Sequence, residues 1–152
     1  MKIINNNIMK FVSKELAIKL KEKGFDKPCF GWYNTDNEIL KLHSCEGTAR
    51  LVLEHPLNCE YIIDAPTTDQ VLEWLREEKN VHIGIMSYVT MTTKNNIMWL
   101  WEILLVGKFI ECKNTLYVDK DYNYTKLASE DYCASYDDAC IDAIEFVIEH
   151  LI

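Results

Sequence analysis

The residues with the clearest potential for chemistry lie between Asp119 and Glu130, where oxygen-bearing side chains alternate with other residues. Positions 1, 3, 5, 7 and 12 of an EF-hand calcium loop are matched by Asp119, Asp121, Asn123, Thr125 and Glu130. That loop also requires a glycine for its sharp turn, but Tyr124 stands at the glycine position. The alternative, a solvated acidic loop with turn-forming Asp and Asn, is favoured because this glycine is missing. We therefore expect no metal and no cofactor.

Cysteine and histidine are the other residue types that could act in catalysis or bind zinc. The nearest approach to a zinc pattern is His43 and Cys45, two residues apart, with His55 and Cys59 downstream. No nucleophile motif occurs, and no Cys-x-x-Cys or His-x-x-x-His pair supplies the close spacing of structural zinc ligands. Cysteines in apolar segments usually pack as small hydrophobic side chains. The sequence thus predicts no catalytic residue and no enzyme.

Aromatic and cationic side chains form the third group of candidates. Trp and Tyr rings offer stacking planes, and Arg or His side chains offer charge, a combination that suits a nucleotide-like ligand. The predicted ligand-binding residues are Trp32, Tyr33, Arg50, Arg76, His82, Tyr88, Trp99 and Trp101. The alternative is structural, because an apolar helical stripe such as the one bearing Trp74 usually marks core, with Arg76 as a surface charge.

Three amphipathic helices are expected to position these residues, over 14–23, 68–79 and 136–150. Each begins after a side chain that can cap the first turn, and the first two end at a residue that adopts left-handed backbone easily. The capping residues are Ser13, Thr67 with Gln70, and Ser135, and the terminating residues are Gly24 and Asn80. The third helix has the most regular apolar stripe.

Strands with turn residues between them fill the remaining chain. The predicted hairpins pair 28–33 with 38–43, 50–54 with 59–63, 81–91 with 97–106, and 109–112 with 116–118. Consecutive hairpins predict an antiparallel sheet with the three helices packed mainly on one face. The fold class is therefore α+β, in a single domain over 1–152.

The strand 97–106 is apolar on both faces. One face carries Ile97, Trp99, Trp101, Ile103 and Leu105; the other carries Met98, Leu100 and Leu104, with Glu102 as the polar exception. A strand of this kind must be covered on both sides. Two interpretations stay open: a central strand of the core, or a homo-oligomer interface.

Charge and the chain start limit the partners and the compartment. The net charge of −8 and the presence of only Arg50 and Arg76 as arginines disfavour binding to nucleic-acid backbone or to an anionic membrane. The acids concentrated between Asp119 and Glu149 indicate a solvated face or, alternatively, a surface that imitates nucleic-acid charge. Residues 1–7 lack the apolar segment of a secretory signal, so we expect a cytoplasmic protein with reduced thiols.

Three blocks of the chain resemble a group of small proteins, without assigned activity, from anaerobic gut bacteria and their phages. The blocks are Ser13 to Cys29, Ala65 to Glu77 with Val81 to Ile83, and Ser135 to Glu145. The resemblance implies the order helix, sheet, helix, hairpin, helix and a phage or prophage origin, hence a host-cell cytoplasm. It transfers no functional residue. The segment 45–59 and the hairpin of 81–91 with 97–106, which bears Trp99 and Trp101, depart from it.

These observations together predict a non-catalytic phage or prophage binding module. The leading hypothesis is a homo-oligomer that sequesters a small nucleotide-like host defence signal. The alternative is an acidic protein that inhibits a host protein, as a nucleic-acid mimic or an interaction protein.

Overall fold

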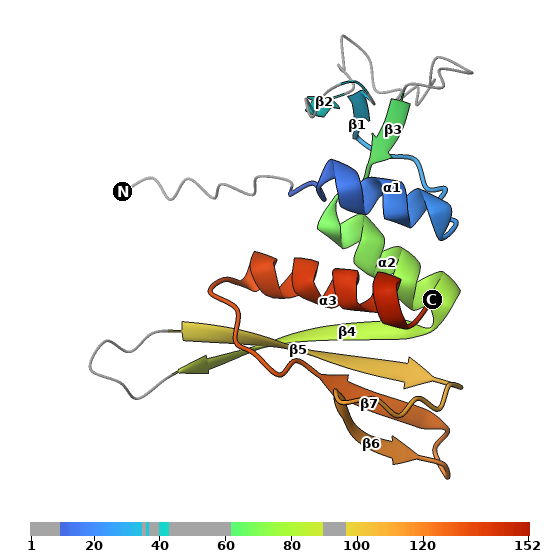
Figure 1. Ribbon diagram of the computed structural model, residues 1–152, viewed down its shortest axis with the longest axis vertical. Helices are drawn as coiled ribbons and strands as arrows, with labels where there is room; N and C mark the ends of the chain where they lie inside the picture. Colours follow the sequence, from blue (N-terminus) through green and yellow to red (C-terminus); the bar gives the residue numbers. More distant parts are fainter. Residues whose placement is uncertain (1–9, 35, 37–39, 43–61, 90–96) are drawn as a thin grey trace, which may run out of the picture. The chain divides into compact units, whose positions relative to one another are not determined.

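The computed structural model describes residues 10–34, 36, 40–42, 62–89 and 97–152 (Figure 1). The chain forms two compact units, Met1–Gln70 and Val71–Ile152. The sequence predicted one domain over the same length, and the boundary between the units falls inside a helix. Each unit is described by itself below.

The first unit packs helix α1 (Lys14–Glu22) against a three-stranded antiparallel sheet. Its strands are β1 (Gly31–Asn34), β2 (Leu40–Leu42) and β3 (Ile62–Ala65), in the order β2-β1-β3. The Ser13 side chain accepts a hydrogen bond of 3.2 Å from the Leu16 amide and so begins α1 as predicted. Gly24 follows the helix with φ of 90°, the left-handed backbone that glycine adopts most easily.

Helix α2 (Thr68–Lys79) has the bounds that the sequence predicts. Its capping box forms: the Gln70 side chain accepts from the Thr67 amide at 3.0 Å, and the Thr67 hydroxyl accepts from the Gln70 amide at 3.3 Å. Asn80 ends the helix with φ of 55°.

The second unit is a four-stranded antiparallel sheet with helix α3 (Tyr136–His150) along one face (Figure 1). The strands are β4 (Val81–Val89), β5 (Ile97–Val106), β6 (Thr115–Asp119) and β7 (Tyr124–Ala128), in the order β4-β5-β7-β6. Ser135 caps α3 through the Asp138 amide at 3.0 Å, as predicted. The α+β class and the antiparallel pairing are confirmed, with the strands divided between two sheets.

The pairing of the last hairpin differs from the prediction. Phe109–Cys112 is not a strand; β6 pairs instead with β7, a segment that was interpreted as an acidic loop. The reason is burial, because Thr125 and Leu127 of β7 are both fully buried while Phe109 is exposed. The hairpin predicted for 81–91 and 97–106 is confirmed over β4 and β5. The predicted strand 50–54 and most of 59–63 lie outside the described residues.

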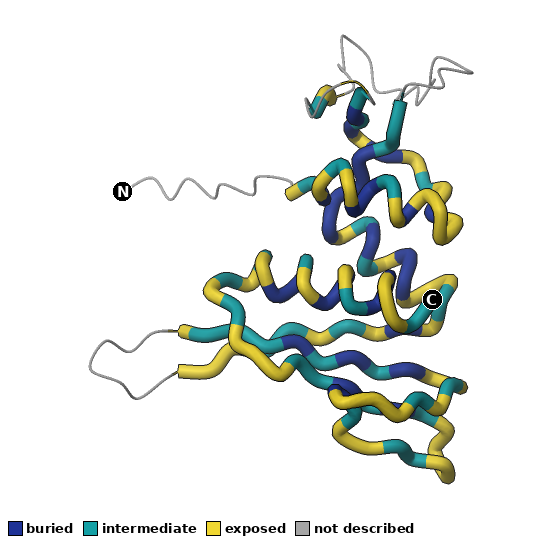
Figure 2. The backbone as a smooth tube through the Cα atoms, viewed as in Figure 1, coloured by how far each residue is buried: buried dark blue, intermediate teal, exposed yellow. Residues whose placement is uncertain are grey.

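The core of the second unit lies between the sheet and α3. Buried residues of β5 alternate with less buried ones, and α3 contributes its predicted apolar stripe (Figure 2). The buried apolar residues of this unit are Val71, Trp74, Leu75, Val81, Trp101, Ile103, Leu105, Leu127, Ala139, Cys140, Ala143, Ile144, Val147 and Ile148. Within the described residues, no helix combines the length and the apolar character needed to cross a membrane.

Candidate functional site

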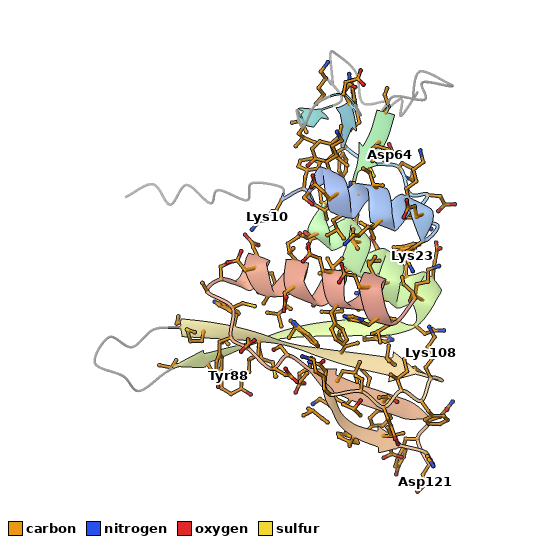
Figure 3. The ribbon with its side chains drawn as sticks, viewed as in Figure 1. Lys10, Lys23, Asp64, Tyr88, Lys108 and Asp121 are labelled. Carbon is orange, nitrogen blue, oxygen red and sulfur yellow. The ribbon has the colours of Figure 1, made fainter. Side chains whose placement is uncertain are left out.

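The face of the four-stranded sheet that points away from α3 carries several aromatic rings and an ion pair. Directly paired residues of antiparallel strands share a face, so the register defines its members. They are His82, Gly84, Met86 and Tyr88 on β4, Met98, Leu100, Glu102, Leu104 and Val106 on β5, Tyr124, Lys126 and Ala128 on β7, and Tyr117 and Asp119 on β6. We call this set the outer face. Figure 3 shows the Tyr88 side chain on the side of the sheet away from α3.

A groove of about 580 Å³ runs over the outer face. Its lining residues are His82, Ile83, Gly84, Glu102, Ile103, Leu104, Tyr117, Tyr124 and Lys126. Gly84 opens the groove because it lacks a side chain, and a Cβ built on it would meet no atom within 4 Å. Glycine weakens a strand interior, and its usual use there is to let another group approach the backbone closely.

An ion pair contributes the polar groups of the groove. The Lys126 ammonium lies 2.8 Å from a Glu102 carboxylate oxygen, and the two side chains are only 29% and 26% exposed. The hydrogen bond to Glu102 is the main cause that raises the pKa of Lys126 above its usual value. The pair presents a donor and an acceptor side by side, with their charges balanced.

Two tyrosines form one wall of the groove. The Tyr117 and Tyr124 hydroxyls share a hydrogen bond of 2.6 Å, and the rings meet edge to face with centroids 5.6 Å apart. The hydrogen bond to Tyr117 is the largest of the causes that raise the pKa of Tyr124 to about 12. Tyr124 is therefore a neutral phenol at physiological pH, able to donate or accept a hydrogen bond.

This arrangement suits a flat ring better than it suits catalysis. Aromatic faces and edges attract a planar ligand, and the few polar groups fix its orientation. Glu102 can accept from a ring amino group while Lys126 donates to a neighbouring ring oxygen or nitrogen.

The structure brings two of the sequence-predicted site residues to the outer face. His82 lines the groove, and Tyr88 lies further along the same strand, with its ring 6.4 Å from the ring of Tyr132. Trp32 and Tyr33 belong to the other unit; the Lys41 ammonium lies over Trp32 at 4.9 Å, and the Tyr33 hydroxyl donates to the Val12 carbonyl at 2.6 Å. Arg76 is exposed on α2, and Arg50 lies outside the described residues.

Trp99 and Trp101 lie on the opposite face of the sheet, toward α3. Trp101 is 2% exposed, packs against Phe146 with ring centroids 4.9 Å apart, and donates from its indole nitrogen to Asp142 at 2.6 Å. The Trp99 ring meets Tyr136 edge to face at 5.5 Å. Trp101 is therefore a core residue, one of the two interpretations left open, and its side chain is not available to a ligand or to a second copy.

The sequence analysis did not select Gly84, Glu102, Tyr117, Tyr124 or Lys126. One signal was present: Glu102 is the single charged residue of an apolar strand, and its cation lies across the sheet on β7. Since 119–130 was read as a loop, the cross-strand neighbour of Glu102 could not be recognised. The partner of an isolated charge is a question of register, which local pattern does not settle.

The stretch that matched a calcium loop is a β-hairpin. Asp119 accepts from the amides of Asp121 and Tyr122 at 3.0 and 2.9 Å, so its carboxylate stabilises the turn. Thr125 is buried and donates to the Lys108 carbonyl at 2.8 Å, while Glu130 pairs with a lysine. The five matched positions do not surround one point, and the described part of the chain holds no cluster of three or more His, Cys, Asp or Glu residues suited to a metal ion.

The described cysteines, Cys29, Cys112, Cys133 and Cys140, are all free thiols, in agreement with the expectation for these four. Burial, with a smaller contribution from the Asp64 carboxylate, raises the pKa of Cys29 to about 12. A thiol with this pKa is protonated at neutral pH and is not an activated nucleophile. Cys45 and Cys59 lie outside the described residues.

The first unit has a hollow of similar volume, about 580 Å³, beside the C-terminal end of α1. It is lined by Ala17, Lys21, Gly24, Phe25, Asp26, Lys27, Pro28 and Asp64. Its one aromatic residue, Phe25, is buried, so no ring is offered for stacking. The outer-face groove is therefore the better candidate for the predicted flat ligand.

Comparisons with known proteins leave the site to be interpreted on its own geometry. No family model, no curated protein and no solved structure matches the chain.

Proposed function

We propose that this protein is a non-catalytic binding module that holds a small, flat, nucleotide-like ligand in the outer-face groove. The observation that carries the proposal is the combination at Gly84, where an open stretch of strand backbone lies between the tyrosine wall and the Glu102–Lys126 pair. A ring placed over Gly84 contacts backbone below it and an aromatic edge beside it. The ion pair then contacts the polar edge of that ring.

The groove favours the base of a nucleotide over its phosphates. Lys126 is already balanced by Glu102, so it offers little net attraction to an anion. The net charge of the chain, −8, repels phosphate further. A nucleoside or a cyclic nucleotide with few charges meets these conditions better than a triphosphate does.

Three parts of the proposal come from the sequence and remain predictions. The resemblance to phage-encoded proteins supports sequestration of a host defence signal in the host cytoplasm. Homo-oligomerisation is predicted from the two apolar faces of the strand 97–106. The absence of catalysis follows from the lack of nucleophile and metal-binding motifs.

Nuclear magnetic resonance titration tests the groove directly. Adenosine, guanosine, cytidine and uridine, with their monophosphates, are added separately to labelled protein while the backbone amide signals are followed. We expect at least one nucleoside to shift the signals of Gly84, Glu102 and Lys126 and to leave those of α1 unchanged. Native mass spectrometry of the protein from cell extract complements the titration, because it detects a retained ligand outside this panel. Shifts confined to other surfaces, with no retained ligand, would refute the proposal.

The acidic-inhibitor alternative has one observation in its favour. Asp138, Asp142, Glu145 and Glu149 are exposed and recur at helical spacing on one side of α3. Two of these carboxylates already have partners within the protein: Asp142 accepts from Trp101, and Asp138 accepts from Ser135. Side chains that hold the fold together are less available to imitate phosphates, so the groove is the preferred site.

A further inference from the structure

Strand β4 forms one edge of the four-stranded sheet and presents backbone groups along it. The Val106 amide donates to the Asn80 carbonyl across the β4–β5 pair, and bonded positions in an antiparallel pair recur at every second residue. The even-numbered residues of β4 therefore bond to β5. The odd-numbered ones, from Val81 to Val89, point their amides and carbonyls outward. Those of Ile83, Ile85 and Ser87 have no hydrogen-bond partner among the described residues.

The two edges of this sheet differ in how they are protected. At the β6 edge, the pairing with β7 is interrupted by a register shift between Thr115 and Tyr117, and the strand ends at Asp119. Bulges and charges are the usual devices that stop a sheet edge from pairing with another chain. β4 has neither: it runs nine residues in continuous register with β5 and contains no Asp, Glu, Lys, Arg or Pro.

We propose that β4 pairs antiparallel with β4 of a second copy of this chain, about a two-fold axis at Ile85. In this register all nine residues are paired, and every outward-pointing position meets another outward-pointing position. Ile85 lies opposite the partner's Ile85, Ile83 opposite the partner's Ser87, and Val81 opposite the partner's Val89. An interface with one surface used twice is what a closed two-fold dimer requires.

The charge and the side-chain sizes along β4 are compatible with a second copy of the chain at this edge. Two copies that each carry a charge of −8 repel each other, but an uncharged strand lets them meet without opposed carboxylates. On the outer face, Gly84 lies beside the partner's Met86, so no two bulky side chains oppose each other there. His82 lies beside the partner's Tyr88.

The dimer completes the groove. In one copy, β4 is the last strand on that side, and none of the described residues that line the groove lies beyond it. Pairing places the partner's Met86 and Tyr88 along that side, which gives the ligand a second aromatic ring opposite Tyr117 and Tyr124. This inference rests on the self-association within the proposed function, but it does not depend on the ligand.

Hydrogen exchange combined with light scattering tests the edge. At tens of micromolar, we expect a dimer in which the amides of Ile83, Ile85 and Ser87 exchange as slowly as those of Gly84 and Met86. In a free edge strand the two sets alternate, because only the even-numbered amides are bonded. A monomer with alternating exchange overturns the inference, and so does a dimer with alternating exchange, because its interface lies elsewhere.

Ser87→Pro is the matched perturbation. Its amide points away from β5, so proline leaves the β4–β5 ladder intact while it removes one edge hydrogen bond per copy. Each lost bond weakens the dimer about fivefold, so the two lost bonds weaken it about 25-fold. Ser87→Ala keeps the amide and should dimerise normally. If the proline variant does not fold, Ser87→Lys places a charge at the same edge position. A folded, fully dimeric lysine variant contradicts the interface.

These experiments can refute the proposed ligand site and the proposed dimer independently of each other. Loss of nucleoside binding with a protected β4 edge rejects the groove alone. If hydrogen exchange alternates along β4 while a nucleoside still shifts the signals of the groove residues, only the dimer is rejected.

Discussion

Filling the groove at Gly84 is the sharpest test of the site. Gly84→Val adds a branched side chain on the outer face, where a Cβ meets no atom within 4 Å. The backbone of Gly84 is not in the left-handed region, so valine adopts it without strain. The same substitution therefore separates the stability of the sheet from the space needed by the ligand.

The expected change in stability is a gain. Glycine within a strand is less favourable than alanine by about 0.5–1 kcal/mol, and β-branched residues rank among the best strand formers on a scale that spans about 1 kcal/mol. A net gain of about 1 kcal/mol corresponds to a rise in melting temperature of about 2–4 °C for a chain of this length. Nucleoside binding should weaken at least about tenfold, because a ring can no longer lie on the Gly84 backbone.

Thermal unfolding followed by circular dichroism measures the first effect, and the nuclear magnetic resonance titration measures the second. Ser87→Val is the control: it adds a β-branched residue to the same strand, on the other face. It should raise the melting temperature and leave binding unchanged. A fall of several degrees for Gly84→Val would mean that the outer face is covered, and unchanged binding in a stabilised variant would refute the groove as the site.

Four further predictions follow from described residues. Ile144→Asp should leave the protein unfolded or insoluble by circular dichroism, because Ile144 is 0% exposed and a buried, unpaired carboxylate costs several kcal/mol; an unchanged melting temperature would remove α3 from the core. Cys29 should react with a thiol reagent only after unfolding, since burial raises its pKa to about 12, and the unfolded, non-reduced chain should titrate as six free thiols. Millimolar calcium should leave the melting temperature unchanged, because 119–130 forms a hairpin; a rise abolished by Glu130→Gln would contradict this. The hydrogen bond to Tyr117 is the largest of the causes that raise the pKa of Tyr124 from its ordinary 10.0 to about 12. Its contribution to stability is therefore full below about pH 10 and is lost as the pH rises through about 12, which denaturation at graded pH can test against Tyr124→Phe.

The helices could be predicted from the sequence almost residue by residue. Helix bounds depend on local chemistry: a capping side chain at the start, left-handed backbone at the end and a stripe of apolar residues between them. Ser13, Thr67 with Gln70, and Ser135 form the predicted caps, and Asn80 ends α2 as expected. None of these features depends on residues far along the chain.

The strands were predictable where a turn joins neighbours. The pairing of β4 with β5 followed from two apolar runs around a polar turn. β7 was missed because its sequence, from Tyr124 to Ala128, mixes polar and apolar residues and lies among acids. Only the pairing with β5 on one side and β6 on the other makes it a central strand with Leu127 in the core.

The sequence by itself determined the α+β class and the helices. It also indicated that a ligand site would be made of aromatic rings and cationic side chains. It could not determine which rings meet, because strand order and register arise from contacts between residues far apart in the chain. Tertiary structure placed Trp101 under α3 and left His82 on the opposite face, although the strands that carry them are direct neighbours. It also brought Glu102, Lys126 and the tyrosine wall around Gly84. A groove built from cross-strand neighbours exists only once the strands are paired.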